Sequence, residues 1–279
     1  MPELPEVETV RRGLQKQLVG AKIKQVKVLR ADSVGHPAAV EFERVLKGRS
    51  FEFLGRRGKY ILAQLSGGFG LGAHLRMSGR LLVLAAKAAE PDHVRVRISL
   101  DDGRKLVFDD TRVFGRLWAV TPGETFEQVI PALTQLGPEP LNGLDTRYLL
   151  RAFQGKKQCI KTALLDQTII AGIGNIYADE SLYRAKINPM QAAGDLRSTE
   201  LKRLGKEIQF VLNNAIELGG STLRDYTDSN GVNGNYQHEA LVYGRKDEPC
   251  RACKSKIVRV KLNGRSTHYC PRCQKNSQQ

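Results

Sequence analysis

The chain has 279 residues, of which 41% are hydrophobic and 26% charged, a composition typical of a folded globular protein and not of a disordered segment. No apolar run is long enough to span a bilayer, and acidic residues interrupt the N-terminal stretch where a secretion signal would lie, so we expect a cytoplasmic protein without membrane contacts. The 44 Lys and Arg exceed the 29 Asp and Glu and leave a net charge of +15, which favours nucleic acid as the partner over a merely basic, solvated surface.

The first predicted element is a helix over residues 5–19, ending near Gly20. Its apolar residues recur at helical spacing and form one stripe: Val7, Val10, Leu14 and Leu18. We expect this stripe to face a core.

The residues before this helix allow two interpretations. If Met1 is removed, Pro2 becomes a secondary amine that can attack an aldehyde carbon. Glu3 would then transfer protons, and Glu6 would bind the opened sugar or hold the amine. The plainer interpretation is a helix start, where proline and acidic residues are favoured. The segment by itself favours the helix start.

Residues 22–120 show a period of two, typical of strands. The clearest strand is 93–100, which places alternate apolar residues on one face. Other short runs lie at 23–28, 51–53, 60–62, 105–108 and 117–120. Many short strands separated by turn residues predict an antiparallel β-sandwich.

A different pattern begins near residue 122. Residues 122–145 are rich in Pro, Gly and Asn and are predicted to be a linker. Helices are then expected over 146–153, 160–166, 175–185 and 198–218, the last with Ser198 as its N-cap. Residues 219–237 are rich in Gly, Ser, Asn and Asp and are predicted to be a loop.

Two glycines precede the third of these helices. Gly172 and Gly174 would leave backbone N–H groups exposed for a phosphate, with Asn175 as an N-cap or a phosphate ligand. The third glycine of a dinucleotide fingerprint is missing, and a tight turn between helices is the plainer interpretation.

Near the C-terminus, Cys250-Arg-Ala-Cys253 and Cys270-Pro-Arg-Cys273 enclose sixteen residues. This spacing is typical of a four-thiolate zinc site, and four ligands leave no position for a catalytic water. Two disulfides or a redox pair are the alternatives, but disulfides are rare in a reducing compartment. We therefore predict one structural Zn²⁺. The fifth cysteine, Cys159, is expected to be a free thiol.

The residues between the cysteine pairs predict a β-hairpin. Residues 256–262 alternate as a strand, Asn263-Gly264 is a turn signal, and residues 265–269 form the returning strand. Arg265 near the tip would grip a phosphate or would simply be an exposed arginine. Residues 245–279 hold ten basic residues and two acidic ones, which favours a role in DNA binding.

Together, the N-terminal Pro-Glu-Leu-Pro-Glu-Val-Glu-Thr, the internal Gly-Ile-Gly-Asn-Ile-Tyr and the four-cysteine finger resemble formamidopyrimidine-DNA glycosylases over essentially the whole chain. The resemblance implies an α+β protein with four regions. These are an N-terminal β-sandwich with its helix (1–121), a linker (122–145), a helix–two-turns–helix module with a lesion-capping loop (146–237) and a zinc-finger hairpin (238–279).

The resemblance also implies an activity and a substrate. Members of the family excise oxidised purines, such as 8-oxoguanine and formamidopyrimidines, from double-stranded DNA and then cleave the strand by β,δ-elimination. We expect the protein to act as a monomer and to need no redox cofactor and no catalytic metal.

The implied site residues follow from the matching motifs. Pro2 resembles the Schiff-base nucleophile, Glu3 the acid–base residue and Glu6 the second carboxylate.

The resemblance also places Lys59 and Arg265 among the catalytic residues. Lys59 would contact phosphate and help to recognise the lesion, and Arg265 would grip the phosphates beside the damaged nucleoside together with Asn175. His74 and Lys156 are expected to bind DNA.

Three further residues resemble a trio that fills the gap left by an extruded base: Met77, Arg112 and Phe114. Without the resemblance, Met77 and Phe114 would be assigned to the core. Val113 departs from the family pattern, which often has a basic residue there, and this puts one contact to the opposite strand in doubt.

Two rival functions stay open on the sequence alone. An endonuclease VIII-like glycosylase shares the Pro-Glu start but prefers oxidised pyrimidines, whereas Leu4 and the complete trio favour the purine enzyme. A non-catalytic DNA-binding protein would use the zinc hairpin and helices for attachment alone.

Overall fold

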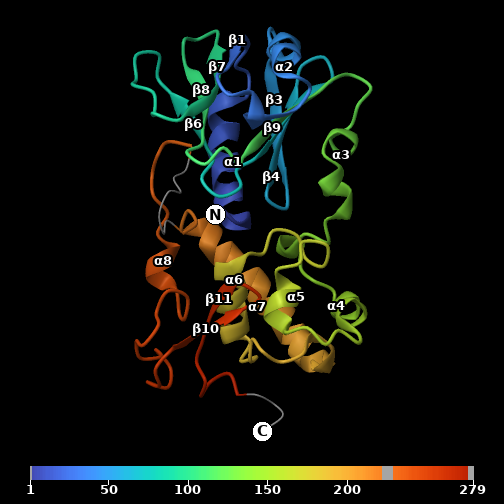
Figure 1. Ribbon diagram of the computed structural model, residues 1–279, viewed down its shortest axis with the longest axis vertical. Coiled ribbons are helices and arrows are strands. Elements are labelled where there is room, and N and C mark those ends of the chain that lie inside the picture. The colour runs from blue at the N-terminus through green and yellow to red at the C-terminus, as the bar shows by residue number, and fades with distance from the viewer. Residues whose placement is uncertain (1, 222–228, 276–279) are drawn as a thin grey trace. The chain divides into compact units, whose positions relative to one another are not determined.

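The computed structural model describes residues 2–221 and 229–275, and its internal contacts divide the chain into two units (Figure 1). The first unit comprises Met1–Gln135 and Leu218–Asn235, and the second comprises Leu136–Glu217 and Tyr236–Gln279. No described helix is both long and apolar enough to cross a membrane.

The first unit is built on two sheets. The four-stranded sheet has the order β1 (Ile23–Val28), β7 (Val94–Leu100), β8 (Lys105–Asp109) and β6 (Arg80–Leu84). The five-stranded sheet has the order β2 (Val34–His36), β9 (Arg116–Val120), β5 (Phe69–His74), β4 (Tyr60–Leu65) and β3 (Phe51–Arg57). Neighbouring strands run antiparallel except β2 and β9, which are parallel.

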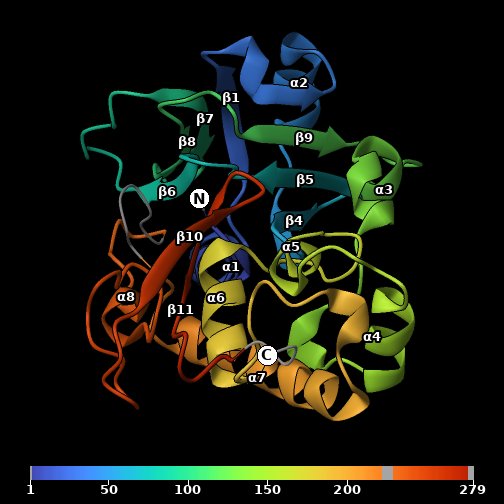
Figure 2. The same cartoon turned by 60° about the horizontal axis from the view of Figure 1, so that its bottom comes forward.

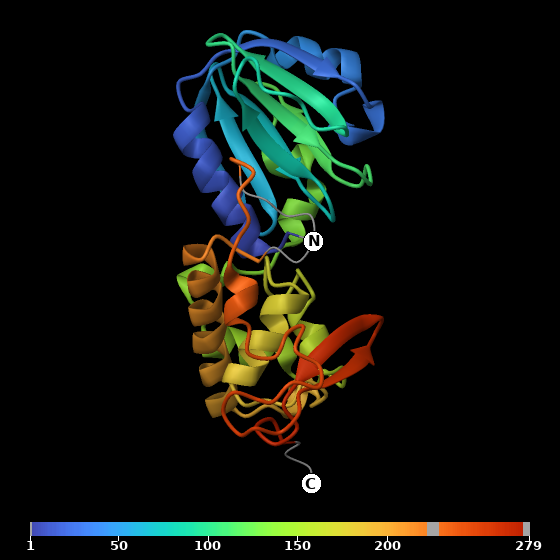
Figure 3. The ribbon, with the colours of Figure 1, turned by 90° about the vertical axis from the view of Figure 1, so that its left-hand side faces the viewer.

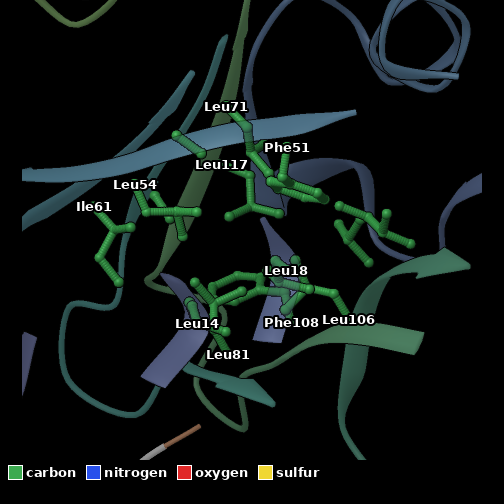
Figure 4. A pocket seen from close by; sticks show the side chains of 14 residues that line it. Leu14, Leu18, Phe51, Leu54, Ile61, Leu71, Leu81, Leu106, Phe108 and Leu117 are labelled. Atoms are coloured by element: carbon green, nitrogen blue, oxygen red, sulfur yellow. The ribbon is translucent and has the colours of Figure 1, made fainter. Parts of the chain in front are cut away.

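The core of this unit combines both sheets with α1 (Leu4–Leu18), which runs along the sandwich in Figure 3. The predicted stripe of α1 is buried, and β7 alternates buried and half-buried residues as its sequence predicts. Side chains of α1 and of both sheets meet around a cavity of about 20 Å³ (Figure 4). Because its lining is apolar, we interpret it as a packing void and not a ligand site.

Several elements of this unit were not predicted. Strand β5 contains Gly70 and Gly72, which weaken its strand signal. These glycines leave room for Phe126 and Ile130, because a Cβ at either position would lie under 3 Å from those side chains. Strands β2 and β6 were missed as well, as was helix α2 (Ala39–Leu46), which buries Phe42.

The unit boundaries differ from the predicted regions. Within the predicted linker, residues 122–135 form α3 (Phe126–Val129) and a 3₁₀ turn (Pro131–Gln135) and belong to the first unit. Residues 218–235 were expected in the helical domain but also belong to the first unit. Backbone hydrogen bonds explain this, since Val83 N–H donates to the Ser229 carbonyl at 3.1 Å.

The second unit is helical. Its helices are α4 (Thr146–Phe153), α5 (Ile160–Leu164), α6 (Asn175–Arg184), α7 (Ser198–Glu217) and α8 (Tyr236–Glu239). The apolar stripe predicted for α7 is buried, although Ser198 begins the helix instead of capping it and Leu218 lies beyond its end.

The predicted hairpin is present beside α6, with strands β10 (Val258–Leu262) and β11 (Arg265–Tyr269) (Figure 2). Asn263 and Gly264 form its turn with φ of 44° and 77°, as a type I′ turn requires.

Candidate active site and nucleic-acid interface

The start of α1 gathers the residues predicted to do chemistry. Pro2 lies before the helix, which begins at Leu4, and the proline in its first turn is Pro5. The preference of helix starts for proline therefore explains Pro5 but not Pro2. Pro2, Glu3 and Glu6 are all buried, and the two glutamates form a capping box. Both glutamates therefore have a structural role at the start of α1.

Glu6 is held from two sides. Its carboxylate accepts hydrogen bonds from the backbone N–H of Glu3 and of Ser221, each at 2.8 Å. Gly220 has a φ of +81°, and a Cβ there would lie 2.9 Å from Glu6 Oε1. The start of the predicted 219–237 loop is therefore fitted around Glu6. Residues 222–228 of that loop lie outside the described residues.

Lys59 lies in the two-residue turn between β3 and β4, where Gly58 has a φ of +54°. Arg56 donates from Nη1 to the Gly58 carbonyl at 2.8 Å and also pairs with Glu8 at 3.1 Å. The Lys59 side chain is buried. An ion pair that starts on α1 therefore supports the turn that presents Lys59.

His74 ends strand β5 and is buried against Tyr60, with ring centroids 4.5 Å apart. Burial, followed by the charges of Arg76 and Lys59, lowers the pKa of His74 to about 3. Its Nδ1 accepts the Arg76 backbone N–H at 3.0 Å. A neutral His74 with an accepting Nδ1 carries its proton on Nε2.

The three residues of the predicted gap-filling trio lie on two exposed loops. Met77 is 41% exposed and Phe114 is 48% exposed, so neither is a core residue. The Arg112 guanidinium lies 5.0 Å from the centre of the Phe114 ring. Single exposed apolar side chains are common on protein surfaces, so this exposure removes both residues from the core without by itself assigning them a partner.

The second unit holds the other predicted DNA contacts. Asn175 begins α6 and donates from Nδ2 to the Ser266 carbonyl at 2.9 Å, so it is tied to the hairpin and is not the N-cap, which is Gly174. Arg265 is exposed beside the turn, and half-buried Lys156 lies in the loop after α4.

A buried polar cluster that the sequence analysis missed supports the hairpin. Lys161 of α5 and Asp179 of α6 form an ion pair with both side chains buried. Asp179 also accepts the His268 backbone N–H at 2.9 Å, and Lys161 Nζ donates to the Ser266 carbonyl at 3.2 Å. The sequence signal for this cluster was that Lys161 and Asp179 each lie among apolar residues. A charged residue that such a stretch buries is expected to have a partner of opposite charge.

The four predicted zinc ligands come together in this unit. The Sγ atoms of Cys250, Cys253, Cys270 and Cys273 all lie within 4.8 Å of one another. With Zn–S bonds of ~2.3 Å, a tetrahedral ion needs sulfur atoms about 3.8 Å apart, so this set fits one Zn²⁺. When bound, zinc cross-links the two knuckles and does no chemistry. Tyr183 of α6 contacts Cys250 Sγ through its hydroxyl at 3.2 Å. Cys159 lies outside the cluster as a free thiol.

Comparison with known proteins covers nearly all of the chain. Family models match residues 1–117 (formamidopyrimidine-DNA glycosylase N-terminal domain), 136–227 (formamidopyrimidine-DNA glycosylase H2TH domain) and 247–276 (zinc finger found in FPG and IleRS). The formamidopyrimidine-DNA glycosylase of Gloeobacter violaceus is 50% identical over 282 residues, covering 100% of this chain and 99% of its own. This chain belongs to the formamidopyrimidine-DNA glycosylase family.

Solved structures of other formamidopyrimidine-DNA glycosylases agree with this family. A complex between a mutant Lactococcus lactis FPG and DNA containing Fapy-dG matches with a TM-score of 0.90 and 35% identity, covering 99% of this chain and 100% of that one. A complex of Lactococcus lactis Fpg with DNA containing an abasic site matches with a TM-score of 0.89, 35% identity and 98% and 100% coverage. The protein is thus a zinc-finger DNA glycosylase of base excision repair, as the sequence predicts.

Proposed function

We propose that the protein is a bifunctional glycosylase and AP lyase that removes oxidised purines, with Pro2 as its nucleophile. The observation that carries this proposal is the start of α1, where Pro2 stands outside the helix beside two buried carboxylates. We also propose that it acts in the cytoplasm, because the four thiols must stay reduced to bind zinc.

The proposed reaction begins at the sugar. Once Met1 is removed, the Pro2 nitrogen attacks C1′ of the damaged nucleotide, the C1′–N bond to the base breaks, and the base leaves with a proton from an acid. Opening of the sugar gives an iminium, and loss of the 3′ and then the 5′ phosphate cleaves the strand. Glu3 moves the protons. Glu6 is held in place by two backbone N–H groups, and its carboxylate would stabilise the cationic nitrogen.

DNA binding is assigned to five polar side chains. We propose that they contact phosphates: Lys59, His74, Lys156, Asn175 and Arg265. The neutral His74 imidazole would donate from Nε2, the nitrogen that the Arg76 N–H leaves for its proton. Asn175 is fixed to Ser266 in the hairpin strand that begins at Arg265, so one contact orients both.

Met77, Arg112 and Phe114 are proposed to enter the duplex when the damaged nucleotide is extruded. Unstacking one nucleotide costs a few kcal/mol, and apolar side chains that occupy the gap offset part of this cost. The exposure of Met77 and Phe114 supports this role. Arg112 has donors that can read the edge of the orphaned base.

Excision of an oxidised pyrimidine is the second candidate activity. A wild-type Lactococcus lactis FPG has been solved with DNA containing an oxidised pyrimidine, at 35% identity to this chain. We would measure single-turnover excision from duplexes carrying one 8-oxoguanine opposite cytosine or one thymine glycol opposite adenine. We expect faster excision of 8-oxoguanine; faster excision of thymine glycol would contradict the assigned lesion class.

A further inference from the structure

The loops that carry Met77 and Phe114 share one anchor. Asp110, which directly follows β8, is 0% exposed. Its Oδ1 accepts hydrogen bonds from the Ser78 hydroxyl at 2.5 Å and from the Arg112 N–H at 3.1 Å. Its Oδ2 accepts from the Gly115 N–H at 2.8 Å. One buried carboxylate thus contacts the residue after Met77 and both sides of the Arg112–Phe114 segment.

The backbone of Asp110 is fixed as well. Its N–H donates to the His93 carbonyl at 3.0 Å, and its carbonyl accepts from Arg95 Nε at 2.7 Å. Arg95 lies in β7, and His93 directly precedes that strand. The carboxylate therefore projects from the end of an interior strand of the four-stranded sheet, and its hydrogen bonds hold the two loops there.

Both loops contain a residue in a conformation that side chains rarely adopt. Arg76 has a φ of 53° and Val113 a φ of 57°, and for β-branched Val113 this conformation is strained. Each residue is next to a member of the exposed trio. Such conformations persist only where the surroundings impose them, and here the Arg112 and Gly115 hydrogen bonds to Asp110 flank Val113.

The space around the anchor is also restricted. A Cβ on Gly115 would lie 2.5 Å from the Phe108 ring and 3.1 Å from Asp110 Oδ2. Glycine at this position lets the chain pass directly over the carboxylate. The contact between the loop and Asp110 is therefore a close backbone approach.

We propose that Asp110 is a positioning residue that couples the Met77 loop to the Arg112–Phe114 loop. The side chains of Met77, Arg112 and Phe114 then enter the duplex together, as one wedge. This inference rests on the proposed function, because it assumes that these side chains fill the gap left by the extruded base. Asp110 itself touches neither the base nor the sugar. Its effect is on how the wedge is aligned.

The adjacent residue provides a matched control. Asp109 is also buried, and it accepts hydrogen bonds from Arg80 and from the His93 N–H. Neither of these partners is in either loop. Asp109→Asn therefore disturbs a buried carboxylate next to Asp110 and leaves the hydrogen bonds of Ser78, Arg112 and Gly115 to Asp110 in place, whereas Asp110→Asn turns an amide N–H₂ toward hydrogen-bond donors.

The test uses the full-length zinc-loaded protein and two DNA probes. The first is a duplex with 2-aminopurine beside a tetrahydrofuran site, on which wedge insertion raises fluorescence without chemistry. The second is single-stranded DNA with an abasic site, on which strand cleavage needs no wedge. For Asp110→Asn we expect loss of the fluorescence change and about 10- to 100-fold slower excision of 8-oxoguanine from duplex DNA, as a misplacement of ~1 Å causes. Cleavage of the single strand should stay at the wild-type rate.

Ser78→Ala gives a milder test, since it removes one hydroxyl and leaves both backbone contacts to Asp110. Its effect should be smaller than that of Asp110→Asn, and the double variant should be no worse than Asp110→Asn alone. Wild-type fluorescence in Asp110→Asn, equal defects in Asp109→Asn and Asp110→Asn, or equal loss on both probes would overturn the proposal. Absence of 8-oxoguanine excision by the wild type would instead contradict the proposed function, and the fluorescence probe would still read the coupling.

Discussion

The two units present the exposed side chains proposed to bind DNA on different supports. In the first unit, the loops bearing Met77 and Phe114 extend from a sandwich whose large apolar core includes α1 and both sheets. In the second unit, the Arg265 hairpin stands on a small cluster of apolar residues and cysteines around Tyr183 and Ile257. In the first unit, hydrogen bonds to Asp110 hold both loops at the end of the β8 strand.

The hairpin has too little apolar surface for that arrangement. It is fixed instead by the four thiolates and by the buried Lys161–Asp179 pair with its contacts to Ser266 and His268. Metal ligation and buried ion pairs replace core size where few apolar residues are available. The comparison predicts that loss of a zinc ligand or of the Lys161–Asp179 ion pair destabilises the second unit and leaves the sandwich folded.

The largest effect is expected from Cys270→Ser. Structural zinc contributes ~10–16 kcal/mol to folding of small fingers, so losing a ligand should unfold the hairpin. DNA affinity should fall at least about tenfold, because one charge-assisted hydrogen bond contributes ~1.5–3 kcal/mol. Zinc content and binding to a tetrahydrofuran duplex check this. Cys159→Ser, which alters the thiol outside the cluster, should keep both; full DNA binding by zinc-free protein would contradict the role of the finger.

Asp179→Asn should have the next largest effect. It leaves the Lys161 ammonium buried without its carboxylate, a change that costs ~3–5 kcal/mol for a buried pair. Unfolding followed by a probe in the second unit should show this loss. Asp145→Asn is the control, because Asp145 caps α4 from the surface and Asn caps a helix equally well. Equal stabilities of the two variants would show that the buried pair does not support the unit.

A smaller, pH-dependent effect is expected at His74. The pKa of His74 in the folded protein is about 3, below its ordinary value. Between these two values the unfolded chain binds a proton at His74 and the folded protein does not. Stability from this group is complete above the ordinary pKa of about 6.5 and is lost as the pH falls toward 3. The wild-type free energy of unfolding should fall by up to ~1.4 kcal/mol per pH unit more steeply than that of His74→Gln.

The control for this prediction is His93→Gln, which alters an exposed histidine of the same unit. The measurement is urea unfolding at several pH values between about 6.5 and 4, with the His74→Gln curve compared with both the wild-type curve and that of this control. Parallel curves for wild type and His74→Gln would mean that His74 titrates normally in the folded protein.

Local patterns predicted the parts of the fold that depend on nearby residues. The alternation of β7, the stripe of α7, the Asn263-Gly264 turn and the cysteine spacing are all confirmed. The unpredicted contacts join residues far apart in the chain. Asp110 binds Ser78, which is 32 residues away in sequence, and Asp179 binds His268, which is 89 residues away. Local sequence periodicity cannot predict contacts over such separations. Strand β5 was missed because Gly70 and Gly72 weaken its strand signal. Both glycines leave space for side chains distant in sequence, Phe126 and Ile130.

The candidate site residues differ in how far the sequence alone can indicate them. Pro2, Glu3 and Glu6 are neighbours in sequence, and their motif is readable without the fold. The two interpretations of that motif turn out to be compatible, since the glutamates cap α1 while Pro2 stands outside it. By contrast, the exposure of Met77 and Phe114 depends on which loops leave the sandwich, and apolar residues alone would be assigned to the core.

The central claim is that Pro2 forms a covalent bond with damaged DNA. The most direct test is borohydride trapping on a duplex with one 8-oxoguanine opposite cytosine, followed by mass mapping of the adduct, with Pro2→Gly as a check on the attachment site. We predict one adduct on the Pro2 nitrogen of protein that has lost Met1. Tight binding without an adduct, in protein whose Pro2 amine is free, would contradict the claim.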